Sequence, residues 1–104
     1  MNIIIGSDHA GFKFKSAIRE HLEQLGHNLI DVGPDTDEST DYPNYAHRVA
    51  QKLSRHREWR GMLICGSGIG MSITANRHTG VRAALCLDAE MAQKAREHND
   101  SNCL

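Results

Sequence analysis

The hydrophobic pattern of the chain alternates between short apolar runs and longer segments with helical spacing. The runs at 2–5, 29–32, 62–64 and 81–86 are rich in aliphatic residues, and a predicted helix follows each of them. Short continuous apolar runs are typical of strands buried in a parallel sheet. The repeated order of strand and helix predicts one α/β domain over residues 1–104, with an open parallel sheet of four strands.

The first two helices are predicted from apolar residues that recur every three or four positions. One helix covers about 12–25 and ends before Gly26, a residue type that commonly closes a helix in the left-handed conformation. The other opens at Tyr42-Pro43, and Trp59 packs near its end. The two apolar faces consist of Phe14, Ile18, Leu22 and Leu25, and of Ala46, Val49, Ala50 and Leu53.

Two further helices and a last strand are predicted in the second half of the chain. A short helix covers about 70–77, and a longer one begins after the capping residue Asp88 and runs to about Glu97. In the longer helix, Ala89, Ala92 and Ala95 allow close packing. The apolar residues Cys103 and Leu104 then predict the start of a fifth strand.

A glycine-rich turn follows the third predicted strand and leads into the short helix. Its glycines, Gly66, Gly68 and Gly70, leave backbone N–H groups unpaired at a helix N-terminus, where phosphate, carboxylate or a developing oxyanion binds. The turn also presents the thiol of Cys65 and the hydroxyl of Ser67. A thiolate is favoured in such a place, so Cys65 is a candidate general base.

Other kinds of glycine loop fit less well. A nucleotide P-loop is excluded because Ser67 stands where lysine is needed, and a cysteine-phosphatase loop is excluded because Met71 stands where its arginine is needed. A dinucleotide fingerprint matches Gly66, Gly68 and the acidic Asp88, but Met71 again replaces a glycine. Dinucleotide binding stays open as an alternative.

The net charge and the cysteine content limit the kinds of binding partner that are expected. The net charge is −1 without a run of Lys or Arg, which argues against nucleic-acid and membrane surfaces and favours small molecules. Without a leader sequence or an apolar stretch of roughly 20 residues, the chain is expected in the cytoplasm. The three cysteines are widely spaced, so free thiols are expected, with no disulfide, metal or cofactor.

The carboxyl ends of parallel strands meet at one edge of a sheet, where ligands bind. This places Asp8 and His9 beside the 65–70 turn, together with the 31–42 loop. His98 and Asn99 follow the last helix and fall at the opposite end. They join the site only if the terminal loop folds back or another subunit supplies them.

Each candidate residue also has a plainer interpretation. Cys65 is equally a buried apolar residue at a strand end, and Ser67 equally a helix cap. Asp8 and His9 are equally a cap and a surface histidine, and His98 a solvated cation at a helix end. The acidic 35–41 segment is interpreted as a solvated loop.

Five segments resemble, in order and over the whole chain, the type B ribose-5-phosphate isomerase family. They are Gly6-Ser7-Asp8-His9-Ala10-Gly11, Asp41-Tyr42-Pro43, Ile64-Cys65-Gly66-Ser67-Gly68-Ile69-Gly70-Met71-Ser72, Arg82-Ala83-Ala84-Leu85-Cys86 and Arg96-Glu97-His98-Asn99-Asp100. The resemblance implies a Rossmann-like three-layer α/β/α sandwich with a five-stranded parallel sheet. It also implies metal-free interconversion of ribose 5-phosphate and ribulose 5-phosphate through a cis-enediolate, in homodimers or dimers of dimers with active sites built across the interface.

The resemblance assigns roles to individual residues. Cys65 corresponds to the catalytic base, His98 to the acid–base residue that opens the sugar ring, and Ser67 to a hydroxyl that is commonly threonine. The anion hole corresponds to Gly66, Ser67, Gly68, Ile69 and Gly70, and the sugar and phosphate contacts to Asp8, His9, Tyr42 and Asn99.

The chain departs from the family at its C-terminus. Family members continue through a fifth strand into a helical segment that supplies phosphate-binding arginines, so the chain is expected to be incomplete relative to them. Two alternatives remain open. One is a subunit of an allose-6-phosphate or galactose-6-phosphate isomerase, and the other is a non-catalytic chain that binds sugar phosphate.

Overall fold

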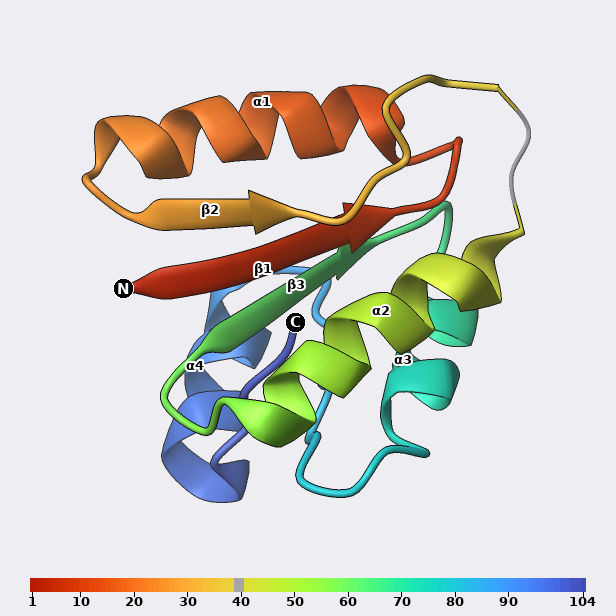
Figure 1. Cartoon of the computed structure of the whole chain (residues 1–104). Coiled ribbons are helices and arrows are strands. Elements are labelled where there is room, and N and C mark those ends of the chain that lie inside the picture. The colour runs from red at the N-terminus through yellow and green to blue at the C-terminus, as the bar shows by residue number, and fades with distance from the viewer. Residues whose placement is uncertain (39–40) are drawn as a thin grey trace.

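The computed structural model describes residues 1–38 and 41–104, and it places Tyr42 by its backbone alone. In this part of the chain the sheet has three strands, β1 (Asn2–Ser7), β2 (Asn28–Asp31) and β3 (Arg60–Ile64). All pairings are parallel and the spatial order is β2-β1-β3, as Figure 1 shows. The predicted parallel α/β fold is confirmed.

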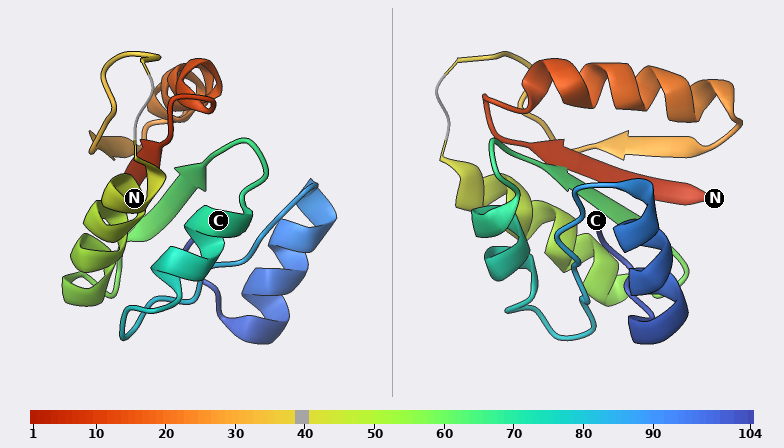
Figure 2. Two further views of the ribbon diagram at one scale, coloured as in Figure 1. Left: turned by 90° about the vertical axis from the view of Figure 1, so that its right-hand side faces the viewer. Right: turned by 180° about the vertical axis from the view of Figure 1, so that it is seen from behind.

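Helices cover both faces of the sheet (Figures 1 and 2). Helix α1 (Phe12–Gln24) lies on one face, and α2 (Tyr42–Arg55) lies on the other with α3 (Ile69–Ala75) packed beside it. Helix α4 (Ala89–Asn99) follows near the C-terminus. The chain therefore forms helix, sheet and helix layers, with the first three strands close to their predicted positions.

The main core lies between α2 and the sheet. The predicted apolar face of α2 is fully buried, and it packs against Ile4 of β1 and Leu63 of β3. Trp59 packs at the edge of this core and stacks on His56, with ring centroids 3.9 Å apart. The prediction for α2 is confirmed. The periodicity of its own apolar residues was sufficient to specify which side of the helix faces the sheet.

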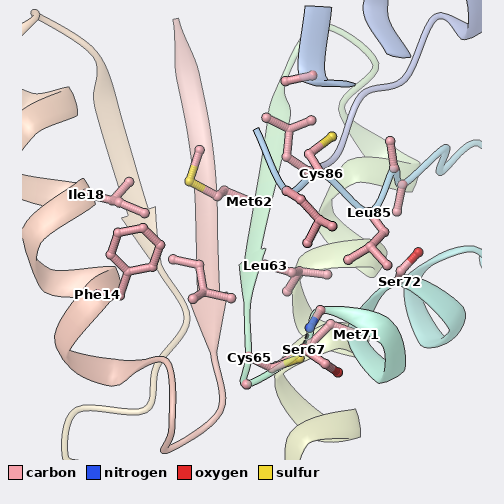
Figure 3. A pocket seen from close by; sticks show the side chains of 18 of the residues that line it. Phe14, Ile18, Met62, Leu63, Cys65, Ser67, Met71, Ser72, Leu85 and Cys86 are labelled. Carbon is pink, nitrogen blue, oxygen red and sulfur yellow. Dashed lines mark hydrogen bonds between the residues drawn. The ribbon is translucent and has the colours of Figure 1, made fainter. Parts of the chain in front are cut away.

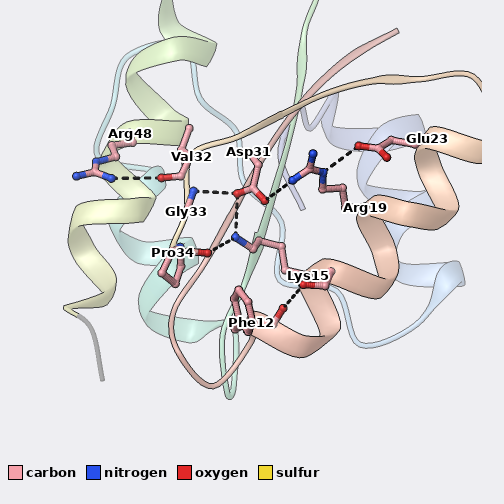
Figure 4. A network of polar contacts seen from close by, with 10 residues as sticks. Phe12, Lys15, Arg19, Glu23, Asp31, Val32, Gly33, Pro34 and Arg48 are labelled. Atoms are coloured by element: carbon pink, nitrogen blue, oxygen red, sulfur yellow. Dashed lines mark hydrogen bonds and ion pairs between the residues drawn. The ribbon is translucent and has the colours of Figure 1, made fainter. Parts of the chain in front are cut away.

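The predicted apolar face of α1 is partly wrong. Phe14 and Leu25 are 63% and 61% exposed, whereas the side chain buried in this helix is Lys15. Its Nζ donates to Asp31 Oδ1 at 2.8 Å and to the Pro34 carbonyl at 2.6 Å (Figure 4). Lys15 is buried because a carboxylate and a carbonyl from the end of β2 satisfy its charge.

The predicted fourth and fifth strands are not full strands. Within 81–86, Ala83 forms a single isolated bridge to Cys103, and Cys103 forms a second to Gly61 of β3. Residues 101–104 thus lie between β3 and the 82–84 segment. In the described residues the sheet therefore has three strands, and the 101–104 segment is joined to β3 and to the 82–84 segment by one isolated bridge each.

The C-terminal residues are nevertheless firmly held. The N–H groups of Gly61 and Leu63 donate to the carbonyls of Asn102 and Leu104, and the N–H of Ala84 donates to that of Cys103. Asn102 and Cys103 are 5% and 1% exposed. The predicted burial of Cys103 is confirmed, and the three cysteines are free thiols as expected.

Capping explains where α4 begins. Asp88 Oδ1 accepts a hydrogen bond from the Met91 N–H at 2.8 Å, so the predicted cap is confirmed. The predicted alanine contacts differ along the helix, since Ala95 is buried and Ala89 is exposed.

Candidate functional site

The loops after β1 and β3 meet at the carboxyl edge of the sheet. The N–H of Asp8 donates to the Ile64 carbonyl at 3.1 Å, and the N–H of Ser7 donates to the Gly33 carbonyl at 3.2 Å. A Cβ atom on Gly11 would lie 2.6 Å from the Ile64 carbonyl oxygen, so the first loop approaches the third strand closely. The prediction that these loops share one edge is confirmed.

The first loop is folded by the side chain of Asp8. Its Oδ1 accepts a hydrogen bond from the Gly11 N–H at 2.8 Å, just before α1 begins. Asp8 is half-buried and His9 is exposed, one residue further along the loop. The N-cap of α1 is Gly11, without a side-chain cap bond, so Asp8 is not the helix cap; its bond to Gly11 fixes the loop before α1.

The loop after β3 folds around two side-chain acceptors. Cys65 Sγ accepts a hydrogen bond from the Gly68 N–H at 2.9 Å, and Ser67 Oγ accepts one from the Ile69 N–H at 3.2 Å. Gly68 has φ of +80°, a conformation that other L-residues rarely adopt. Ser67 thus bonds the first N–H of α3 without being its N-cap, which is Gly68, and the sulfur of Cys65 faces a backbone donor.

Three of the predicted anion-hole donors are still available. The N–H groups of Gly68 and Ile69 are taken by the thiol and the hydroxyl. Those of Gly66, Ser67 and Gly70 have no hydrogen-bond partner among residues 1–38 and 41–104. The turn can therefore offer backbone donors to an oxyanion.

The turn opens into an apolar cleft of about 450 Å³ between β3 and the 83–87 segment. Figure 3 shows Phe14 and Ile18 of α1 on one side, Leu85 and Cys86 on the other, and Cys65 with Ser67 at one end. Sequence analysis did not assign the 85–87 side chains to the site. They follow the 81–84 segment at the same edge as the other loops, which was the available signal.

Two thiols line this cleft and differ in their surroundings. Burial, followed by the charge of Asp88, raises the pKa of the Cys86 thiol above its ordinary value. Cys65 instead has the Gly68 N–H directed at its sulfur. Cys65 is therefore the better candidate for a base.

Two features argue against a dinucleotide site. Asp88, which would bind the ribose, is engaged in capping α4 through its Oδ1 atom. Met71 occupies the third glycine position of the fingerprint, and its side chain is 1% exposed within the core. The close packing of helix on strand that a glycine at this third position permits is therefore blocked.

The structure does not bring His98 and Asn99 to the cleft. Both are exposed in the last turn of α4. Six residues separate His98 from Ala92, the residue of α4 nearest to it that lines the cleft, and this corresponds to about 9 Å along the helix. The side chain of Tyr42 lies outside the described part of the chain.

The described residues contain no cluster of metal ligands and no helix suited to span a membrane. No group of three or more His, Cys, Asp or Glu side chains is placed to hold a metal ion within residues 1–38 and 41–104. Over the same residues, no helix combines the length and apolar character that crossing a bilayer requires.

Comparison with known proteins defines the class. The family model described as Ribose/Galactose Isomerase matches residues 3–104. Ribose-5-phosphate isomerase B of Escherichia coli (strain K12) is 45% identical, over 98% of this chain and 68% of its own length. The solved ribose-5-phosphate isomerase B of Clostridium thermocellum superposes with a TM-score of 0.96 at 45% identity, over 100% of this chain and 70% of that one.

A second solved structure includes a sugar phosphate. It is ribose-5-phosphate isomerase B from Mycoplasma genitalium with bound ribulose-5-phosphate, which superposes with a TM-score of 0.95 at 42% identity, over 99% of this chain and 69% of that one. The fold and the matched sequence define an isomerase. The chain belongs to the Ribose/Galactose Isomerase family.

Proposed function

We propose that this chain interconverts ribose 5-phosphate and ribulose 5-phosphate through a cis-enediolate, with Cys65 as the base and without a metal ion. The observation that carries the proposal is the Gly68 N–H directed at Cys65 Sγ, in a turn where the N–H groups of Gly66, Ser67 and Gly70 have no partner among the described residues. Such a donor stabilises a thiolate, and the free donors stabilise the enediolate oxygens. The sugar phosphate named in the related Mycoplasma structure supports the substrate class.

The proton transfers balance within the substrate. The Cys65 thiolate removes the proton from C2 of the aldose, and the electron pair moves through the C1–C2 bond to the carbonyl oxygen. Ser67 relays a proton between O2 and O1, and the thiol returns its proton to C1 to give the ketose. The free N–H groups of Gly66 and Gly70 bind the developing oxyanion, while Asp8, His9 and Tyr42 contact the sugar or phosphate.

His98 and Asn99 act from a second copy of the chain in this proposal. Within one chain His98 lies about 9 Å along α4 from Ala92, the nearest residue of this helix that lines the cleft, and both His98 and Asn99 are exposed. A symmetric homodimer can place the end of α4 of each copy over the cleft of the other. His98 then supplies the proton transfers that open the sugar ring.

Turnover of ribose 5-phosphate by Cys65→Ala tests the base. We expect a fall of about 10²–10⁴-fold, with loss of exchange between the C2 proton and deuterated water measured by NMR. Cys86→Ala, which removes the second thiol of the cleft, is the matched control and keeps its turnover. Unchanged exchange in Cys65→Ala would refute the assignment of Cys65. Turnover that survives dialysis against EDTA supports a reaction without metal.

Assays with other sugar phosphates distinguish the alternative functions. Turnover of galactose 6-phosphate or allose 6-phosphate in preference to ribose 5-phosphate would reassign the substrate within the family. Binding of these sugar phosphates without any turnover would indicate a non-catalytic binding chain.

Mixing two inactive variants tests the shared site. Cys65→Ala and His98→Ala chains mixed in equal amounts form heterodimers in which one site retains both residues, so about a quarter of wild-type activity returns. No recovery, although exchange of subunits is demonstrated by native mass spectrometry, would contradict a site built from two chains.

A further inference from the structure

A second hollow lies at the amino end of the sheet, away from the Cys65 cleft. It has a volume of about 480 Å³ and lies between the turn from α2 to β3, the 79–82 segment and the end of α4. The two sites share no lining residue. The proposed isomerisation therefore leaves this hollow without a role.

The hollow is lined by four arginines from four different segments. Arg57 comes from the α2–β3 turn, Arg60 is the first residue of β3, Arg82 lies in the segment beside the C-terminus, and Arg96 lies in the last turn of α4. Asp100 supplies the carboxylate of this lining. The side chains that face the hollow therefore carry a net charge of +3, on a chain whose overall charge is −1.

Asp100 offsets only part of this charge. It pairs with Arg82 Nη2 at 3.3 Å and with Arg96 Nη1 at 3.1 Å, through its two carboxylate oxygens. Arg60 Nη1 donates to the Trp59 carbonyl at 3.1 Å, which leaves its charge without a counterion in the described residues. Each guanidinium has five N–H donors, so most of the donors around the hollow remain available.

Arg57 provides the strongest evidence for an anion-binding site. Its side chain lines the hollow and makes no hydrogen bond or ion pair with any residue of 1–38 or 41–104. Like charges that gather in one place repel one another, and a bound anion removes that repulsion. A guanidinium directed at such a place is suited to an anion with several oxygens.

The chemistry of the lining indicates phosphate. The planar fork of arginine pairs two N–H groups with two phosphate oxygens, which gives geometric specificity as well as charge. The hollow lies within the range of roughly 300–1,000 Å³ that holds small-molecule ligands, and this is larger than one phosphate requires. Guanidinium groups from four segments match a chain of adjacent phosphates better than a single phosphate.

We propose that the hollow lined by Arg57, Arg60, Arg82 and Arg96 is a binding site for the phosphate chain of a small oligophosphate. The ligand is either free oligophosphate or the phosphate chain of a nucleotide. Binding stabilises the end of α4 against the turn from α2 to β3, because it joins charges carried by both.

Calorimetric titration with sodium tripolyphosphate, at low ionic strength, tests the site. We expect saturable binding with one site per chain, which weakens as salt rises. Arg57→Gln reduces the affinity about tenfold or more, because a charge-assisted contact is lost. Arg57 has no structural contact to lose, so the variant keeps its thermal transition and its isomerase turnover.

Arg55→Gln is the matched control. It removes a guanidinium only two residues earlier, at the end of α2, but Arg55 does not line the hollow. We expect its affinity for tripolyphosphate to fall less than threefold, about 0.6 kcal/mol or less. Equal losses in the two variants would show diffuse attraction to a positive surface and would overturn the proposal, as would the absence of binding at millimolar tripolyphosphate.

Two further ligands identify the source of the phosphates. ATP that binds as tightly as tripolyphosphate shows recognition of the phosphate chain alone, and tighter binding of ATP shows that the nucleoside contributes. Orthophosphate that binds as tightly as tripolyphosphate would contradict a site for a chain of phosphates. Because Arg57→Gln leaves the Cys65 cleft unchanged, its effect separates this site from the proposed isomerase site.

Discussion

Cys103 is the most deeply buried thiol of the described residues, and its surroundings change its acidity. Its side chain is 1% exposed between Gly61 and Ala83, and this burial raises the pKa of the thiol to about 12. The unfolded thiol ionises near pH 8.5. Between these values the folded state retains a proton that the unfolded state has lost, so the thiol makes stability fall as pH rises.

The free energy of unfolding as a function of pH measures this effect. From about pH 9 to 12 we expect the wild-type chain to lose up to roughly 1.4 kcal/mol per pH unit more than Cys103→Ser, whose hydroxyl stays neutral. Urea titrations at several pH values provide the measurement. Parallel curves for the two proteins would show that Cys103 does not keep its proton in the folded state.

At the scale of single residues, sequence analysis predicted Cys65 and the turn that holds it but missed Lys15. Glycines at alternate positions after an apolar run are a local signal, and the structure places Cys65 in the expected turn. The burial of Lys15 depends on Asp31 and Pro34, which lie 16 and 19 residues further along the chain. No periodicity within α1 contains that information.

Capping of α4 gives a prediction at the scale of one element. Asp88→Ala removes the bond to the Met91 N–H and leaves a helix N-terminus without its side-chain acceptor. We expect the free energy of unfolding to fall by about 1 kcal/mol. The measurement is urea unfolding followed by circular dichroism. Asp37→Ala removes the same charge from an exposed position outside any helix or strand and is expected to change stability little.

The predictions of helices and strands were correct where the sequence signal lay within a few neighbouring residues. The apolar face of α2 and the cap of α4 are properties of a few neighbouring residues, and both are confirmed. The predicted strand over 81–86 failed because a strand exists only where a partner pairs with it. Its partner is the short 101–104 segment, and residues 85 and 86 have no backbone hydrogen bond to any described residue.

The C-terminal segment gives a prediction for the whole molecule. Asn102 is 5% exposed, and its amide accepts from the Arg82 N–H at 2.8 Å and donates to the Gly80 carbonyl at 2.9 Å. Asn102→Ala leaves the Arg82 N–H without its acceptor, whereas the Gly80 carbonyl keeps a donor in Arg82 Nη1 at 3.3 Å. A buried group that loses its partner costs about 1–3 kcal/mol, so stability in urea is expected to fall by that amount.

Asn44→Ala is the control for this variant, because Asn44 is exposed at the start of α2 and its removal is expected to have little effect. Proton exchange at the Gly61 and Leu63 amides, which donate to the C-terminal segment, gives an independent measurement. Unchanged protection of these amides in Asn102→Ala would show that Asn102 does not hold the segment in place.

The sequence by itself determined the order of strands and helices, the shared carboxyl edge and the turn that presents Cys65. These features follow from local periodicity and from the rule that parallel strands end at one edge. Only the tertiary structure decided that Lys15 is buried, that 81–86 lacks a ladder and that four arginines surround one hollow. Each of these depends on residues distant in sequence, whose approach is set by packing rather than by any local pattern.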